Sequence, residues 1–198
     1  MRVKTESRRQ SIIEAALEVF KAVGYERASM AEISARVGGS KATLYNYFKS
    51  KEELFAAAML EAIEEQGLQL LAMLDREDAD LATVLRNFGR AFMRFVTSAK
   101  VLSIIRMAMA EGANSGLGPL LYARGPQRVW QEMASRLAGL MDAGILRKSD
   151  PEIAALHFKG LLEAGFLEPA LYGAPPRLDE ETGTSWAVDV FLRAYGRE

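Results

Sequence analysis

Apolar residues recur at helical spacing along almost the whole chain, and polar positions separate them. No segment shows the strict alternation that is typical of a half-buried strand, and there is no internal repeat or low-complexity tract. Two short helices are expected between Ser29 and Lys51. Longer helices are predicted over about 7–23, 51–74, 80–98, 100–111, 119–124, 126–143, 151–170 and 184–195. The chain is therefore predicted to be all-α, with nine or ten helices.

The segment 29–51 carries the strongest local signals. Ser29, followed three residues later by a glutamate, forms a capping box at the start of a helix. Gly38 and Gly39 end that helix, and Ser40 caps the next one. Two short helices about a tight turn, the second rich in hydrogen-bond donors and aromatics, predict a helix-turn-helix.

Charge is distributed unevenly, although the whole chain has a net charge of −1. Residues 1–51 hold ten Lys and Arg against five Glu, and the remainder holds 15 basic and 21 acidic residues. This asymmetry favours a basic, polyanion-binding head on an acidic body, and chance clustering on a solvated surface is the alternative. The same two interpretations, a phosphate-binding arm or a solubilising terminus, apply to Arg2, Lys4, Arg8 and Arg9.

Composition excludes several classes of protein. The chain has no cysteine, which excludes disulfides, thiolate zinc sites and a cysteine nucleophile and fits a reducing compartment. The basic N-terminus leads into an amphipathic helix, not into the apolar core of a signal peptide. No apolar run approaches the roughly 20 residues that span a bilayer. We therefore expect a cytoplasmic protein with no membrane partner.

The N-terminal quarter resembles the TetR (tetracycline-repressor-type) family of transcription regulators. The resemblance is carried by an amphipathic first helix that ends in GYERASMAEISARVG, followed without a gap by GSKATLYNYFKSKEEL. It implies a helix-turn-helix DNA-binding domain over 1–50 and a ligand-binding and dimerisation domain over 51–198. One departure is Gly39, where the family usually has an apolar residue. The implied function is a ligand-responsive regulator, expected to be a repressor.

The resemblance also implies DNA-contacting residues. Lys41 and Asn46 are the candidates for base readout, because Lys pairs with guanine and Asn with adenine. Lys51 is expected to hold a phosphate at the start of its helix, where a lysine otherwise opposes the helix dipole; an ordinary exposed lysine is the alternative. Tyr47 is the residue of the set whose spacing also fits the apolar face. The full predicted set is Ser29, Ser40, Lys41, Thr43, Tyr45, Asn46, Tyr47 and Lys51.

The body matches the family in its layout, and its last quarter looks like the regulatory domains of the multidrug-regulator branch. This likeness implies a homodimer that pairs helices at about 151–170 and 184–195 across a two-fold axis. Two copies place two heads on a palindromic operator of double-stranded DNA. The predicted contacts are Leu156, Lys159, Gly160, Glu163, Ala164, Leu167, Trp186, Val190 and Tyr195.

Aromatic and methionine side chains are abundant in the body, and they suit a pocket for a small hydrophobic or amphipathic effector. Arg106 interrupts an apolar helix, so it is expected to pair with Glu111 or Glu163, or to hold an acidic ligand. The alternative is that these residues are simply core, and His157 is interpreted as a core or interface residue. The predicted ligand-binding set is Phe88, Phe92, Phe95, Arg106, Met107, Trp130, Met133 and Phe166.

Two other functional classes remain as alternatives. An all-α enzyme needs a catalytic group, but the sequence has no Gly-rich phosphate loop, no metal-ligand cluster and a single histidine. A helical protein-interaction module would leave the basic head without a role. No enzyme activity and no cofactor are therefore predicted.

Overall fold

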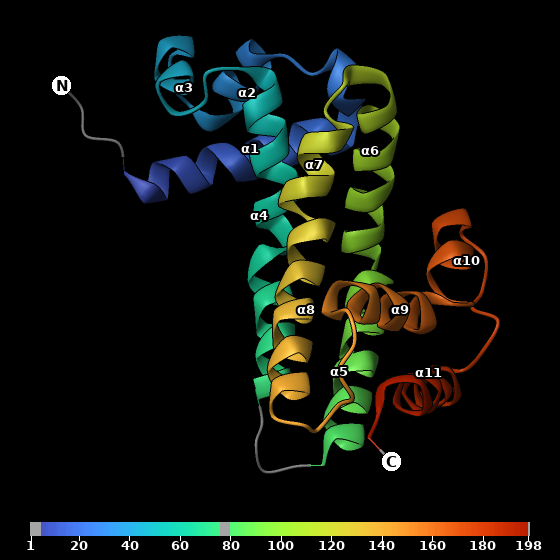
Figure 1. The fold of residues 1–198 in the computed structure, drawn as a ribbon. Helices are drawn as coiled ribbons and strands as arrows, with labels where there is room; N and C mark the ends of the chain where they lie inside the picture. The colour runs from blue at the N-terminus through green and yellow to red at the C-terminus, as the bar shows by residue number, and fades with distance from the viewer. Residues whose placement is uncertain (1–4, 76–79, 198) are drawn as a thin grey trace. The chain divides into compact units, whose positions relative to one another are not determined.

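The computed structural model describes residues 5–75 and 80–197, and these residues are almost entirely helical (Figure 1). Among them, the only β-type pairing is one isolated bridge between Leu146 and Gly196. The helices are α1 Glu6–Arg27, α2 Met30–Val37, α3 Lys41–Tyr47, α4 Lys51–Ala72, the 3-10 turn η1 Met73–Asp75, α5 Leu81–Val96, α6 Ala99–Ser115, α7 Gly118–Arg124, α8 Pro126–Asp142, α9 Pro151–Glu163, α10 Leu167–Tyr172 and α11 Glu180–Tyr195. The all-α prediction is confirmed. None of the described helices is long and apolar enough to cross a membrane.

The chain divides into two compact units. The first unit comprises Met1–Ile63 and Ile104–Tyr122, and the second comprises Glu64–Ser103 and Ala123–Glu198. Helices α4, α6 and α7 each contribute residues to both units. The predicted division into a DNA-binding domain over 1–50 and a ligand-binding and dimerisation domain over 51–198 is one of function, and it stays a prediction.

The core of the first unit joins α1, α2, α3, the start of α4 and the later helices α6 and α7. Phe20, Tyr25 and Phe55 form an aromatic group, with the rings of Phe20 and Tyr25 each 4.9 Å from that of Phe55. These three side chains are buried, as are Leu44 and Phe48 from the helix-turn-helix. Burying side chains of this size stabilises each element by about 1.5–3 kcal/mol per residue.

The first helix differs from its prediction at both ends. Thr5, not Ser7, is the N-cap, because the Thr5 hydroxyl accepts a hydrogen bond from the backbone of Arg8. A capping box is also possible in the sequence at Ser7 with Gln10, but the structure does not use Ser7 as the N-cap. Gly24 was expected to end the helix, but it adopts φ +79° and kinks the chain, and a last turn continues to Arg27. A positive φ at glycine permits this kink without strain.

The second unit is organised around α5, α8, α9 and α11. Helix α9 packs against α8 and α11, and α11 also packs against α5. Phe88, Phe158 and Phe191 lie buried where these helices meet. At Gly89 an added Cβ would lie 2.7 Å from the side chains of Leu162 and Thr184, so a glycine is needed for this close approach.

The predicted helix over 151–170 is two helices in the structure. Helix α9 ends at Glu163 and α10 begins at Leu167, with Gly165 at φ +79° between them. This break raises the number of α-helices in the described ranges to eleven, against the nine or ten predicted. The last helix begins at Glu180 instead of 184, because Asp179 caps it by accepting a hydrogen bond from the backbone of Thr182.

Candidate nucleic-acid interface

Helices α2 and α3 form a helix-turn-helix whose caps are those predicted. The Ser29 hydroxyl accepts a hydrogen bond from the backbone of Glu32 at 3.1 Å, and the Ser40 hydroxyl accepts one from that of Thr43 at 3.1 Å. Gly38 lies between the helices in the left-handed region, at φ 71° and ψ 59°. Each side-chain cap satisfies one of the first N–H groups of its helix, so both helices have a defined start without DNA.

Three of the predicted DNA-contacting side chains are exposed on α3. Lys41, Tyr45 and Asn46 face solvent, whereas Leu44 lies in the core of the first unit. An ammonium group and a side-chain amide are the groups that read guanine and adenine edges in the major groove. Their role in DNA contact stays a prediction, and their exposure is what such a role requires.

Other members of the predicted set form hydrogen bonds within the protein. The Ser40 and Thr43 hydroxyls lie 2.9 Å apart and share a hydrogen bond. The half-buried Tyr47 accepts a hydrogen bond at its hydroxyl from the backbone N–H of Thr5, at 3.1 Å. Tyr47 therefore fastens the start of α1 to α3, which is a structural role that its spacing had left open.

Lys51 has an internal role that the sequence did not indicate. Its ammonium donates hydrogen bonds to the carbonyl oxygens of Tyr25 at 2.9 Å, Ala28 at 3.3 Å and Glu26 at 3.4 Å. It also lies 4.1 Å from the centre of the Tyr25 ring. The predicted conflict between a lysine and the start of a helix is thus offset by carbonyls at the end of α1, without a phosphate. Binding of phosphate by Lys51 stays a prediction.

Tyr25 connects three helices of the first unit. Its hydroxyl donates to Glu52 of α4 at 2.9 Å, and its backbone N–H donates to Glu111 of α6 at 3.2 Å. Burial, together with the hydrogen bond to Glu52, raises the pKa of Tyr25 above its ordinary range. The pKa of Glu52 is lowered, first by its own backbone N–H and then by Ser50 and Tyr25. This junction could not be predicted from the sequence, because Tyr25, Glu52 and Glu111 are far apart along the chain.

The predicted ligand-binding residues are distributed over both units. Phe88, Phe92 and Trp130 are buried against each other, with Phe92 edge-on to Trp130 at 5.3 Å. Met133 and Phe166 are also buried. Phe95 is half-buried in the same unit, whereas the exposed Arg106 and the half-buried Met107 belong to the first unit. The role of this set in ligand binding stays a prediction.

The two carboxylates suggested as partners of Arg106 each have another contact in the structure, and the pairing of Arg106 itself stays a prediction. Glu163 forms an ion pair with Lys159, one turn away on α9, and Glu111 accepts a hydrogen bond from Tyr25. Arg106 is exposed, so the expectation that a buried cation needs a carboxylate does not apply to it. A helical pattern cannot separate an arginine that interrupts a buried face from one at its edge.

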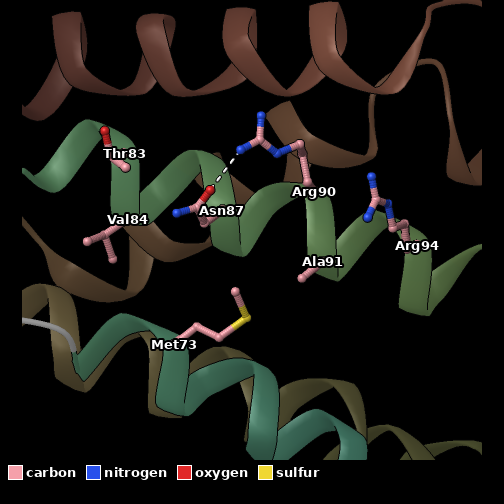
Figure 2. A pocket seen from close by; sticks show the side chains of 7 residues that line it. All are labelled: Met73, Thr83, Val84, Asn87, Arg90, Ala91 and Arg94. Carbon is pink, nitrogen blue, oxygen red and sulfur yellow. Dashed lines mark hydrogen bonds between the residues drawn. The ribbon is translucent and has the colours of Figure 1, made fainter. Parts of the chain in front are cut away.

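A hollow of about 690 Å³ lies beside α5 in the second unit and is lined by Met73, Thr83, Val84, Asn87, Arg90, Ala91 and Arg94. Figure 2 shows Met73 of η1 pointing toward α5, whereas the side chains of Arg90 and Arg94 extend from α5 in the direction away from Met73. Arg90 donates to the amide oxygen of Asn87 at 2.7 Å, and Arg94 pairs with Glu180. None of the predicted ligand-binding residues lines this hollow. The sequence feature that could have predicted this hollow is the row of polar residues at helical spacing on α5, at positions 83, 87, 90 and 94.

An exposed apolar face is formed on α9 and α11, which pack against each other. Leu156 is 53% exposed and Trp186 is 59% exposed, and Ile153 and Val190 are also exposed. Tyr195, also predicted for this face, is instead buried with its hydroxyl 2.6 Å from Nδ1 of His157. Soluble proteins rarely leave large apolar side chains clustered in water unless another surface covers them.

The sequence matches two protein-family models, one N-terminal and one C-terminal. Residues 12–58 match the model of bacterial regulatory proteins of the tetR family, and residues 83–197 match that of the AefR-like transcriptional repressor C-terminal domain. The HTH-type transcriptional activator FasR of Mycolicibacterium smegmatis is 41% identical over 95 residues, which are 48% of this chain and 43% of that protein. The HTH-type transcriptional regulator BetI of Yersinia pestis is 28% identical over 175 residues, 84% of this chain and 82% of BetI.

Solved structures agree with these matches. A TetR-family transcriptional regulator from Mesorhizobium loti superposes with a TM-score of 0.84 at 25% identity, over 98% of this chain and all of that one. The flavonoid-responsive regulator FrrA superposes with a TM-score of 0.83 at 27% identity, with the same coverage. The chain covers less than half the length of some curated relatives, FasR among them.

Proposed function

The chain belongs to the TetR family of bacterial regulatory proteins, and from this premise we propose that it is a ligand-responsive repressor that binds a palindromic operator as a homodimer. The observation that carries the proposal is the capped α3, which exposes Lys41, Tyr45 and Asn46 while Leu44 and Phe48 hold it in the core. A rigid helix with exposed amide and ammonium groups is suited to the major groove.

The dimer is proposed to form through the exposed apolar face of α9 and α11. Trp186 and Leu156 supply the large side chains of this face. A symmetric dimer is the simplest way to cover one such face with another copy of itself. Two copies would place two α3 helices on the half-sites of a palindrome, about one helical turn of DNA apart.

An effector is proposed to bind in the second unit and to release the operator. The hollow beside α5 combines the apolar side chains of Met73, Val84 and Ala91 with polar ones, which suits a small amphipathic molecule. Helices α4 and α6 each contribute residues to both units, and within the first unit Tyr25 of α1 bonds to Glu52 of α4 and to Glu111 of α6. Such a ligand would act by favouring the conformation that does not fit the operator.

Selection of bound duplexes from a random library tests the proposal. We expect an inverted repeat to be enriched, and failure to enrich any palindrome would refute the function as a specific regulator. Lys41→Ala and Asn46→Ala should each weaken binding by about tenfold or more and relax the preference at one base pair of each half-site. Lys21→Ala is the matched control, because Lys21 is an exposed cation of α1 that pairs with Glu18.

The effector proposal has its own measurement. Small hydrophobic and amphipathic compounds should be added to the purified protein–operator complex, and release should be followed by fluorescence anisotropy. A compound that releases the operator should lose that effect when Ala91, a half-buried residue of the hollow, is replaced by Asp, which places a charge in the hollow. Unchanged release by that variant would exclude the hollow as the effector site.

A further inference from the structure

Three successive carbonyl groups in the turn between α2 and α3 accept hydrogen bonds from side chains. Arg8 of α1 donates from Nη1 to the Val37 oxygen at 3.3 Å and from Nη2 to the Gly38 oxygen at 3.0 Å. Ser34, a buried residue of α2, donates from its hydroxyl to the Gly39 oxygen at 2.9 Å. Carbonyls at the end of a helix have no partner inside that helix, so these donors determine how the chain leaves α2.

Gly39 leaves room for one of these donors. A Cβ added at Gly39 would lie 2.8 Å from Nη2 of Arg8, and the only atoms within 4 Å of it belong to Arg8. The backbone of Gly39 does not have a positive φ, in contrast to Gly38. The backbone would therefore accept any residue, and what a side chain at this position would meet is the guanidinium of Arg8, which would have to move.

Arg8 thus joins α1 to the turn across about thirty residues of sequence. Its planar guanidinium spans two neighbouring carbonyls, which the single ammonium of a lysine does not reproduce in the same geometry. The guanidinium borders a small hollow that is also lined by Ser40 and Thr43, at the start of α3. Any shift of Arg8 therefore acts directly on the segment that leads into α3.

We propose that Arg8 and Gly39 form a matched pair that fixes α3 relative to α1, which makes Arg8 a positioning residue for operator recognition. This inference rests on the proposed function, because it assumes that α3 reads the operator. Arg8 acts through the turn and not as a phosphate contact. When the pair is broken, α3 samples orientations that do not fit the base edges, and affinity falls by the fraction of molecules in the fitting state.

Substitution of Arg8 separates positioning from phosphate binding. Arg8→Ala and Arg8→Lys should both lower operator affinity by about tenfold, while binding to a random duplex changes little. The slope of affinity against salt should be the same for Arg8→Lys and the original protein. A phosphate contact would instead leave Arg8→Lys close to the original affinity, and that result would overturn the proposal.

A double-mutant cycle at Arg8 and Gly39 tests the pairing. Gly39→Ala alone should lower both the melting temperature and operator affinity, because the new methyl group displaces the guanidinium. In the Arg8→Ala background the same change should cost no affinity, and it should leave or raise the melting temperature, since alanine restricts the unfolded chain. Gly139→Ala is the control, because a Cβ there meets no atom within 4 Å. Additive effects of the two changes would refute the pairing.

The two measurements fail in different ways. The melting-temperature cycle uses protein without DNA, so it tests the pair even if no operator is found and the proposed function fails. If the cycle shows coupling while Arg8→Ala retains full operator affinity, Arg8 only stabilises the fold and the positioning role is excluded. Coupling in both melting temperature and operator affinity supports the proposal.

Discussion

The helix-turn-helix and the α9–α11 face use their side chains in opposite ways. In the helix-turn-helix, Ser29, Ser34 and Ser40 satisfy backbone groups, and the large apolar side chains are buried. On the α9–α11 face, Trp186 and Leu156 remain more than half exposed. The first surface has its large apolar side chains covered within one chain, whereas the second leaves apolar area exposed, which a second copy is proposed to cover. In this proposal, a reading element formed within one chain depends for its function on assembly through the other region.

Charge placed on the α9–α11 face should have the largest effect. The double variant Leu156→Glu and Trp186→Glu should be monomeric, because a charge buried at an apolar interface is strongly unfavourable. Operator affinity should then fall by about hundredfold or more, since the second head no longer binds as part of the same molecule. Sedimentation velocity and operator titration measure the two effects.

Tyr172→Glu is the control for this change. Tyr172 is 85% exposed on α10, outside the α9–α11 face, so its replacement should leave both assembly and affinity unchanged. If the double variant remained dimeric, the assignment of the dimer to α9 and α11 would be wrong.

Truncation of Trp130 tests whether the aromatic residues of the second unit are core. Trp130 is 6% exposed and packs edge-on against Phe92, so Trp130→Ala should lower the unfolding free energy by about 3–5 kcal/mol. Denaturant unfolding measures the loss, with Gln131→Ala on the exposed side of α8 as control. A loss below about 1 kcal/mol would mean that Trp130 lines an open pocket instead of a packed core.

Replacement of Lys51 can show whether this lysine stabilises the fold, contacts DNA, or does both. Lys51→Met removes the hydrogen bonds to Tyr25, Glu26 and Ala28, so it should lower the unfolding free energy by about 1–3 kcal/mol. If Lys51 also binds a phosphate, as predicted from the sequence, the slope of operator affinity against salt should fall by about one. Full stability of the Lys51→Met variant would contradict the internal role.

The smallest effects concern the helix caps of the two regions. Ser29→Ala should lower the unfolding free energy by about 1 kcal/mol at any pH, because a hydroxyl does not titrate in this range.

The cap of α11 should instead depend on pH. Hydrogen bonds from Thr182 lower the pKa of Asp179, which caps α11, so Asp179→Ala should destabilise the protein at neutral pH. This difference from the original protein should shrink as the pH falls below about 4, where the aspartate becomes protonated. Melting temperatures of the two variants and the original protein at pH 7 and pH 3 test both predictions. If Asp179→Ala lowered the melting temperature equally at the two pH values, the carboxylate of Asp179 would not stabilise α11 through its charge.

Local signals in the sequence predicted the fold better than they predicted the site. Caps at Ser29 and Ser40 lie within a few residues of the groups they satisfy, so the helix-turn-helix followed from the sequence. The break at Gly165 did not, because a glycine inside an apolar pattern is compatible with a continuous helix. Whether it continues or kinks the chain depends on packing, here on Phe166 fitting against Gly183.

Long-range contacts account for what the sequence could not predict in the candidate site. Lys51 reads as a surface lysine until the end of α1 is placed beside it. Gly39 is only a departure from the family pattern in the sequence, whereas in the structure Arg8, about thirty residues earlier, occupies the space that a side chain would fill. Pockets and cores are lined by the same types of aromatic residue, so the sequence does not show which of the two Phe92 and Trp130 form. The structure shows that they pack against each other.

Half-site spacing tests the central claim most directly, because it asks whether two preformed reading helices are joined in one dimer. Roughly five base pairs, about half a helical turn, are inserted between the half-sites of the selected operator. Affinity of the original protein should fall by about hundredfold or more, while the Leu156→Glu and Trp186→Glu double variant should bind both duplexes equally weakly. Equal affinity of the original protein for the two duplexes would contradict the account.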